Sequence, residues 1–368
     1  MVDLTLLLAR IISGAPVDSR DVAALDVDTL LGAAAEHDVV PLLADRLLRT
    51  PDLPPVLAGR LREQATAAAV VDLVREAEVR RFFDRMDTAG VGALLVKGSH
   101  LAYTHYERPD LRARVDTDVL VARTAVPVVH RLLTDVLGYE ASDHVSNDLT
   151  APQRAYTTRL PRAAHTFDVH WQLSSPRVFA SMPSVEDLTG RSLPLAKLGP
   201  AARVPSSVDA LLIACVHRVA HHLDACELKW LYDIHLVAGR FDREEWDRFV
   251  KLAAASAVGA VCHRSLTLAA ECFGTPLPDD VRSGADLTAG AGNEPSAAYL
   301  KPEPMLRRVI GDARVLSWTD RVRLMREHLF PATAYMRQVY APSSRLPLPV
   351  LYARRIVRGM WGWFRLRT

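Results

Sequence analysis

The hydrophobic pattern changes near residue 90, and this change constrains the fold more than any other feature of the sequence. Before it, apolar residues recur every three or four positions, and the longest such pattern runs from Pro55 to about Ala89. Gly90 follows, and glycine is common just past the end of a helix. After it, Val91–Val96 is a short, continuous apolar run, which is typical of a buried strand. The chain therefore joins a helical N-terminal region to a segment that contains strands.

The segment that contains strands extends over about residues 88–175. Its hydrophobic pattern indicates three further strands, at Val115–Val121, Tyr156–Leu160 and Thr166–Leu173. Between the first two of these, Thr124–Leu137 has helical spacing and is followed by Gly138. Strands and helices in this alternating order predict a small α/β core.

The rest of the chain has a mostly helical pattern. Ser206–Ala238 is expected to be helical and to begin with a capping box made by Ser206 and Asp209. The proline-containing stretch Ser174–Pro205 is expected to be a connection, and Gly274–Pro304 a mobile loop. The last 60 residues are basic and apolar, which indicates short helices. We predict three parts, which are a helical region at 1–88, the α/β core at 89–205 and a helical domain at 206–368.

The overall composition excludes several classes of protein. Hydrophobic residues make up 49% and charged residues 24%, which is typical of globular proteins and not of disordered or fibrous ones. Lys and Arg number 45 against 43 Asp and Glu, so only a local basic patch would attract nucleic acid. The four cysteines are spaced by 11, 36 and 10 positions, which fits no zinc motif and indicates reduced thiols in a cytoplasmic protein. We expect neither a signal peptide nor a membrane-spanning segment, because no run of 18 apolar residues occurs.

A candidate phosphate-binding turn, Lys97-Gly98-Ser99, directly follows the first strand. A Gly-Ser turn at the start of a helix presents backbone N–H groups and a hydroxyl, which suit phosphate oxygens. The ammonium of Lys97 would add a positive charge. The alternative is an ordinary turn, because Gly-Ser is also common in turns that bind nothing.

Two aspartates, Asp116 and Asp118, are two positions apart in the second strand, so their carboxylates share a face. Carboxylates this close repel each other unless a cation lies between them, and Mg²⁺ prefers oxygen ligands. Asp168 in a later strand would join them if the two strands are neighbours, and Arg112 could hold a phosphate. Three carboxylates beside a phosphate-binding turn suit two-metal phosphoryl-type transfer. The alternative is a pair of exposed acids on a solvent-facing strand.

Together these motifs resemble the nucleotidyltransferase superfamily, whose signature is an apolar strand, a Gly-Gly or Gly-Ser turn, an Asp-x-Asp strand and a third acid. The chain looks more closely like a bacterial family of uncharacterised nucleotidyltransferases. The segments that carry this resemblance are His37–Leu43, Leu94–Ser99, Arg112, Asp116–Val121, Leu137–Tyr139, Asp168–Trp171, His217–His221 and Lys229–Asp233. The resemblance covers about residues 30–240. Sixteen residues separate Ser99 from Asp116, more than in the smallest members of the superfamily.

The resemblance implies an α+β protein with a polymerase-beta-like core, that is, a small mixed sheet flanked by N-terminal and C-terminal helical regions. It implies a nucleotidyltransferase that uses an NTP, such as ATP, with Mg²⁺ or Mn²⁺. Asp116, Asp118 and Asp168 would then be both the catalytic residues and the metal ligands. The residues expected to bind the nucleotide are Lys97, Gly98, Ser99, Arg112, His170, His221, Lys229 and Asp233. The acceptor is not implied, and a small molecule, a peptide or a sugar is favoured.

The helical segment after the core also contains candidate residues. His217 and His221 are four positions apart and share a helix face. They would form a polar wall of the nucleotide pocket, a structural pair, or a zinc site completed by Asp224 or Glu227. Lys229 and Asp233, also four positions apart, would form an ion pair within the helix, or Lys229 would contact the triphosphate while Asp233 orients it. Both sets of alternatives stay open at this point.

The C-terminal segment Arg354–Arg365 mixes arginines with aromatic residues. Such a segment could lie on a membrane surface, cover a nucleic acid or pack as a helix on the body of the protein. Two further functions also fit the motifs of the core. One is a related transferase that moves a phosphoryl or glycosyl group, for instance in peptide or polysaccharide tailoring. The other is a non-catalytic module that only binds a nucleotide.

Overall fold

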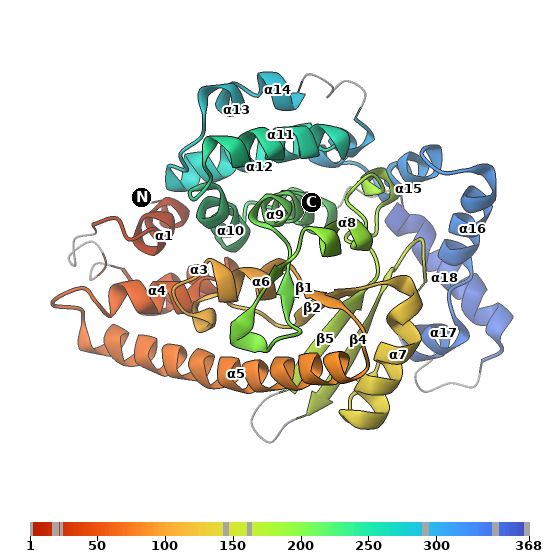
Figure 1. The fold of residues 1–368 in the computed structure, drawn as a ribbon, viewed down its shortest axis with the longest axis horizontal. Helices are drawn as coiled ribbons and strands as arrows, with labels where there is room; N and C mark the ends of the chain where they lie inside the picture. Colours follow the sequence, from red (N-terminus) through yellow and green to blue (C-terminus); the bar gives the residue numbers. More distant parts are fainter. Residues whose placement is uncertain are drawn as a thin grey trace.

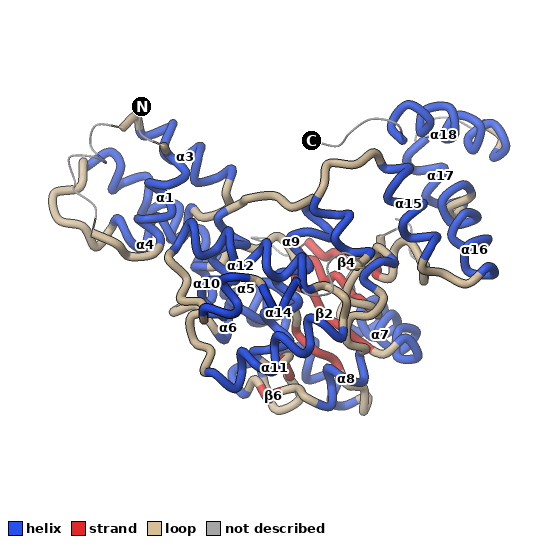
Figure 2. The backbone as a smooth tube through the Cα atoms, turned by 90° about the horizontal axis from the view of Figure 1, so that it is seen from above, coloured by secondary structure: helices blue, strands red, loops and turns tan. Residues whose placement is uncertain are grey.

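The computed structural model describes residues 3–16, 22, 25–142, 147–159, 164–288, 294–340 and 346–363. These residues form an α+β fold in which helices surround one mixed sheet of seven strands (Figure 1). The N-terminal helices and the last helices lie at opposite ends of the molecule (Figure 2). The fold class expected from the sequence is therefore confirmed.

The sheet has the strand order β3-β4-β5-β2-β1-β7-β6. Its strands are β1 Ala93–Leu95, β2 Thr117–Val121, β3 Glu140–Ala141, β4 Gln153–Arg159, β5 Ala164–His170, β6 Leu193–Pro194 and β7 Arg203–Val204. The β2–β5 and β1–β7 pairs are parallel, and the other neighbouring pairs are antiparallel. The expected neighbourhood of the strands with Asp118 and Asp168 is confirmed, because these two residues are register partners.

The two faces of the central strands are covered by different helices, because side chains alternate between the faces of a strand. Helix α5, Pro55–Thr88, and helix α7, Val126–Arg131, lie on one face, where Phe82 packs with Val119 and Phe167. Helix α9, Ser207–His222, and helix α8, Val185–Gly190, cover the other face through Ile213 and Leu188, which pack with Leu120. Figure 1 shows α5 and α9 on opposite sides of the sheet. Asp118, Asp168 and His170 therefore point toward α9.

Helices far apart in the sequence share the largest hydrophobic core. They include α1 Leu4–Ile12, α3 Val27–Glu36, α4 Val40–Leu47, α9, α10 Leu228–Ala238, α11 Arg243–Ala255 and α12 Gly259–Phe273. Helix α1 packs on α12, so the start of the chain lies against residues of its second half. The predicted three-part division of the chain stays a prediction.

Two expectations about connections are corrected by the structure. The helical stretch after Ser206 is not continuous, because Leu223 and Asp224 have left-handed backbones with φ of 56° and 60° and separate α9 from α10. The expected connection at Ser174–Pro205 contains α8 and the strands β6 and β7. Strands of two residues are too short to show an alternating pattern.

The C-terminal part of the chain is helical, as expected. The stretch expected to be a mobile loop contains α13 Asp279–Ser283, α14 Ala285–Thr288 and a 3₁₀ segment at Pro295–Leu300, while 289–293 lie outside the described residues. The helices that follow are α15 Met305–Arg314, α16 Trp318–Leu329, α17 Thr333–Tyr340 and α18 Leu348–Trp363. In the part of the chain that the structure describes, no helix combines the length and the apolarity needed to cross a bilayer.

Candidate active site

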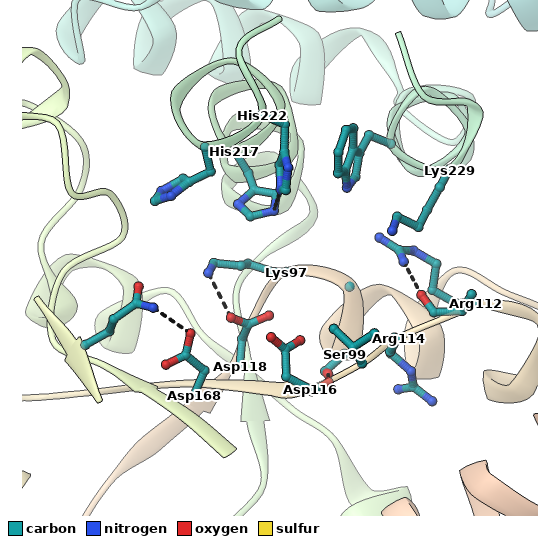
Figure 3. Close-up of a pocket in the computed structure, with 16 residues that line it drawn as sticks. Lys97, Ser99, Arg112, Arg114, Asp116, Asp118, Asp168, His217, His222 and Lys229 are labelled. Carbon is teal, nitrogen blue, oxygen red and sulfur yellow. Dashed lines mark hydrogen bonds and ion pairs between the residues drawn. The ribbon is translucent and has the colours of Figure 1, made fainter. Parts of the chain in front are cut away.

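A cavity of about 270 Å³ lies between the sheet and helices α9 and α10 (Figure 3). We call Lys97, Asp116, Asp118 and Asp168 the floor, since they lie on or next to the strands. We call His217, His221, His222 and Trp230 the roof, because they come from α9 and α10. The other lining residues are Gly98, Ser99, Arg112, Ala113, Arg114, Val115, Gln153 and Lys229. The predicted site residues thus line one cavity, except His170 and Asp233, which lie behind its surface.

Asp118 is the best-bound carboxylate of the floor. Its Oδ1 accepts a hydrogen bond from Lys97 Nζ at 2.8 Å and lies 2.8 Å from His170 Nε2. Burial raises the pKa of Asp118, but Lys97 and the His170 hydrogen bond outweigh burial, so the pKa lies well below its usual range. Burial and Lys97 lower the pKa of His170, but its hydrogen bonds to Asp118 and Asp168 raise it overall. Asp118 therefore stays ionised among partners that favour its charge.

Asp168 has one bound and one unpaired oxygen. Its Oδ2 accepts a hydrogen bond from Gln153 Nε2 at 2.8 Å and lies 3.4 Å from His170 Nε2. Its Oδ1 is buried and has no hydrogen-bond partner within the described structure. A buried carboxylate oxygen without a partner is costly unless a cation or a proton occupies its free side.

Asp118, Asp168 and His170 each offer one ligand atom, and these three atoms lie within 4.8 Å of one another. Two carboxylates and one imidazole, with one oxygen left unpaired, fit a divalent cation. The metal ligands predicted from the sequence were Asp116, Asp118 and Asp168. In the structure, the compact group contains His170 in place of Asp116. The role of Asp116 as a metal ligand stays a prediction.

Asp116 lies beside Asp118 and lines the same cavity (Figure 3). Burial and the neighbouring charge of Asp118 raise the pKa of Asp116 to about 6, although Lys97 acts in the opposite direction. Asp116 therefore holds its proton at a higher pH than an ordinary aspartate does. The two acids of the Asp-x-Asp motif have opposite electrostatic environments, which their spacing alone could not show.

The predicted phosphate-binding turn joins β1 to helix α6, Lys97–Thr104. Lys97 adopts a left-handed backbone with φ of 53°, and its ammonium lies 3.1 Å from His170 Nε2 as well as on Asp118. The Ser99 hydroxyl donates to the Asp116 carbonyl at 3.4 Å. A Cβ on Gly98 would lie 3.0 Å from an Arg112 guanidinium nitrogen, so glycine leaves room for that group.

Arg112 and Asp233 form a buried ion pair beside the cavity. Arg112 Nε and Nη2 donate to the two Asp233 oxygens at 2.8 and 2.6 Å, and Tyr106 donates to Oδ1 at 2.8 Å. The alternative in which Lys229 and Asp233 form an ion pair within the helix is therefore wrong. Asp233 faces inward toward Arg112, whereas Lys229 lines the cavity and pairs with Asp38. The predicted roles of Arg112, Lys229 and Asp233 in nucleotide binding stay predictions.

The imidazoles of the roof carry no charge. Burial lowers the pKa of His217 well below its usual range, that of His221 to about 3 and that of His222 to about 4. His222 stacks on Trp230 with ring centroids 3.8 Å apart and lies 3.1 Å from His217 through their Nε2 atoms. His217 Nδ1 and His221 Nε2 are buried without a hydrogen-bond partner among the described residues. The roof therefore borders the cavity with neutral aromatic rings.

The zinc alternative for the histidines lacks its third ligand. Asp224 pairs with Arg218 at 2.6 Å and with Arg264 at 3.3 Å. Among the described residues, the one group of three metal-ligating side chains within 4.8 Å is that of Asp118, Asp168 and His170.

Sequence reasoning missed the positions of Gln153 and Trp230. Gln153 is opposite His170 in the β4–β5 pair, and this register could not be predicted from the sequence. The sequence did contain a signal for His170 as a possible ligand, because His170 is two positions from Asp168 and therefore lies on the same face of the strand.

A hydrogen-bond chain fixes β2 from the other face of the sheet. The Thr117 hydroxyl lies 3.0 Å from His165 Nε2, and His165 Nδ1 lies 2.7 Å from the Tyr139 hydroxyl. Tyr139 in turn donates to Glu78 of α5 at 2.9 Å. Thr117 stands between Asp116 and Asp118 of the floor, so α5 helps to hold both in place.

The comparison with known families agrees with this geometry. The model of an uncharacterised nucleotidyltransferase family matches residues 23–274, which include every residue that lines the cavity. No curated protein matches the chain, so this comparison indicates no substrate. Because the match covers more than half of the sequence, this chain belongs to the family of uncharacterised nucleotidyltransferases.

Proposed function

We propose that the protein is a metal-dependent nucleotidyltransferase that moves a nucleotidyl group from an NTP to an acceptor hydroxyl or phosphate. The observation that carries the proposal is the group of Asp118, Asp168 and His170 within 4.8 Å, with a buried Asp168 oxygen left unpaired. Asp118 and Asp168 of this group line a cavity that also contains the Gly98-Ser99 turn. Family membership supports nucleotidyl transfer in general, and the acceptor stays open.

Asp118, Asp168 and His170 are the residues that would hold the cation, Mg²⁺ or Mn²⁺. A cation there would offset the negative charge of the triphosphate and of the transition state. The imidazole is a better ligand for transition metals than for Mg²⁺, so Mn²⁺ belongs in every assay.

Lys97 is the candidate phosphate-binding cation, because its ammonium lies on the floor of the cavity. Its ammonium contacts Asp118 and His170, where it balances the charge of the floor. The left-handed backbone at Lys97 starts the turn, and Lys97, Gly98 and Ser99 line one cavity. We propose that this turn binds the triphosphate of the NTP.

Asp116 is the candidate general base of the reaction. It lines the cavity outside the compact group of three, next to the residues that would hold the cation, where it can accept a proton from an acceptor. In the step we propose, the acceptor oxygen attacks the α-phosphorus and its proton passes to Asp116. The bond between the α-phosphorus and the oxygen that bridges to the β-phosphate breaks, and pyrophosphate leaves. Asp168, which the resemblance makes a catalytic residue and a metal ligand, is bound by Gln153 and belongs to the group of three.

The test is transfer of label from NTP by the purified protein. The protein is incubated with α-labelled NTPs, Mg²⁺ or Mn²⁺ and host extract, and products are identified by mass spectrometry together with the leaving group. We expect pyrophosphate release, and we expect D118N and D168N each to lower the rate by about 10³-fold or more. D247N, which changes an exposed acid outside the cavity, is the control and should keep the rate.

Three outcomes would contradict the proposal. Full transfer activity of D118N or D168N would contradict the proposed cation site. Transfer of a γ-label or a glycosyl group would replace nucleotidyl transfer by one of the related transfers. Tight binding of a non-hydrolysable NTP in calorimetry with no product would indicate a nucleotide sensor.

A further inference from the structure

The C-terminal helices α15 to α18 form a segment with its own surface character. They lie outside the matched residues 23–274 and at one end of the molecule (Figures 1 and 2). Of the 19 large hydrophobic side chains exposed among the described residues, 11 belong to residues 305–357. Exposed apolar side chains scattered singly need no explanation, but a concentration in one segment indicates an interaction surface.

Helix α16 carries an exposed apolar stripe. Trp318, Val322 and Met325 are 75%, 55% and 38% exposed, and their spacing of four and three places them on one side of the helix. Leu324, which is 1% exposed, anchors the helix from another side. The stripe is therefore a presented surface of a packed helix.

Helix α18 repeats this arrangement. Val350 and Val357, seven positions apart, are 47% and 57% exposed. Leu351 is fully buried against Met336 of α17 and anchors the helix. Both helices thus keep aliphatic or aromatic side chains in solvent although they have buried anchors.

The charge of this segment is strongly positive. Residues 305–368 contain 13 arginines and 3 acidic residues, whereas the whole chain contains 45 basic and 43 acidic residues. The preceding 304 residues are therefore net negative. The exposed Arg314, Arg326 and Arg337 form no ion pair with any other residue that the structure describes. These cations are available to an anionic partner.

We propose that the apolar stripe of α16 and the nearby Arg314 and Arg326 form a docking surface for an anionic lipid membrane. Helices that lie in a membrane interface combine an aromatic and aliphatic stripe with a basic polar side, and arginines add attraction to acidic headgroups. A nucleic acid would use the arginines but not the aliphatic stripe. A second copy of the same surface would be repelled by its charge. The surface lies on the membrane and does not cross it, and it does not depend on the proposed reaction.

The experiment is co-sedimentation of the full-length protein with lipid vesicles. Vesicles of phosphatidylcholine with 30% phosphatidylglycerol should bind the protein, and vesicles of phosphatidylcholine alone should bind it about tenfold more weakly. Raising the salt from 50 to 500 mM should weaken binding to the anionic vesicles.

Two double variants separate the parts of the surface. W318S/V322S removes apolar contact and R314Q/R326Q removes charge, and each should weaken binding about tenfold. L73S, which changes a 70% exposed leucine of α5, is the matched control and should bind like the wild type. Unchanged thermal unfolding of the variants shows that they fold.

Several results would overturn the proposal. They are equal binding of the two vesicle types, no binding of the wild type to either, or full binding by folded W318S/V322S. Binding to single-stranded RNA that the R314Q/R326Q change weakens, without any binding to vesicles, would assign the surface to nucleic acid.

Discussion

The floor and the roof of the cavity are both at least half-buried, yet they hold different electrostatic states. On the floor, the Asp118 carboxylate stays charged because Lys97 and His170 contact it. On the roof, His217, His221 and His222 lose their charge because burial is not balanced by a bound carboxylate. Burial alone therefore does not determine the charge of a site, and the partner within hydrogen-bond distance does.

The difference divides the tasks that we propose for the site. A floor of charged groups suits a cation and a triphosphate. A roof of neutral imidazoles and an indole suits stacking and hydrogen bonds, so we expect it to contact the nucleobase or the acceptor. The ion pair of Arg112 and Asp233 connects the two, because Arg112 lies in the loop before β2 and Asp233 lies in α10.

Breaking this connection should have the largest effect on stability. D233N leaves the Arg112 guanidinium buried without its charge partner, and we expect a loss of about 3–5 kcal/mol in the free energy of unfolding. Urea unfolding followed by circular dichroism measures it. Y106F, which removes only the hydrogen bond to Asp233, is the control and should cost about 1 kcal/mol. Equal losses in the two variants would show that the ion pair does not hold the floor to the roof.

Replacing Asp116, the floor residue with a raised pKa, should have an intermediate effect on the free energy of unfolding. The unfolded Asp116 carboxyl loses its proton near pH 4 and the folded one near pH 6, so this group lowers the free energy of unfolding as the pH rises between these values. In chelator-treated protein, D116N should therefore be about 2 kcal/mol more stable than the wild type at pH 7.5 and equally stable at pH 4. Urea unfolding at both pH values measures this. A gain of the same size at pH 4 would contradict the assignment.

The roof should respond to pH with the opposite sign and a smaller effect. The folded pKa of His221 is lowered to about 3, so its stabilising contribution is complete above the unfolded value near 6.5 and is lost as the pH falls through that value. H221Q should lose about 1 kcal/mol less than the wild type between pH 7.5 and pH 5.5. Thermal unfolding at the two pH values measures it, with His263→Gln, outside the cavity, as the control. An equal acid loss in H221Q and the wild type would mean that the roof titrates like solvent-exposed histidine.

The sequence predicted the parts of the site that depend on local periodicity. Asp116, Asp118 and Asp168 could be placed because strand residues two apart share a face, and the structure puts Asp118 opposite Asp168. The partners that come from distant segments could not be placed. Arg112 and Asp233 are 121 positions apart, and the helical spacing of Lys229 and Asp233 favoured a contact that tertiary packing does not make. Helical boundaries set by glycine were predictable, whereas the break at Leu223 has no such residue.

The parallel register of β2 and β5 restricts how relatives of this chain can diverge. Insertions or deletions in the connection between β4 and β5 leave Asp168 opposite Asp118. One residue inserted in β5 before Asp168 would turn this carboxylate toward Phe82 and bring a neighbouring apolar side chain into the cavity. Among relatives, the connection between β4 and β5 should therefore vary in length. The part of β5 that precedes Asp168 should keep a constant length, even where the overall sequence identity is low.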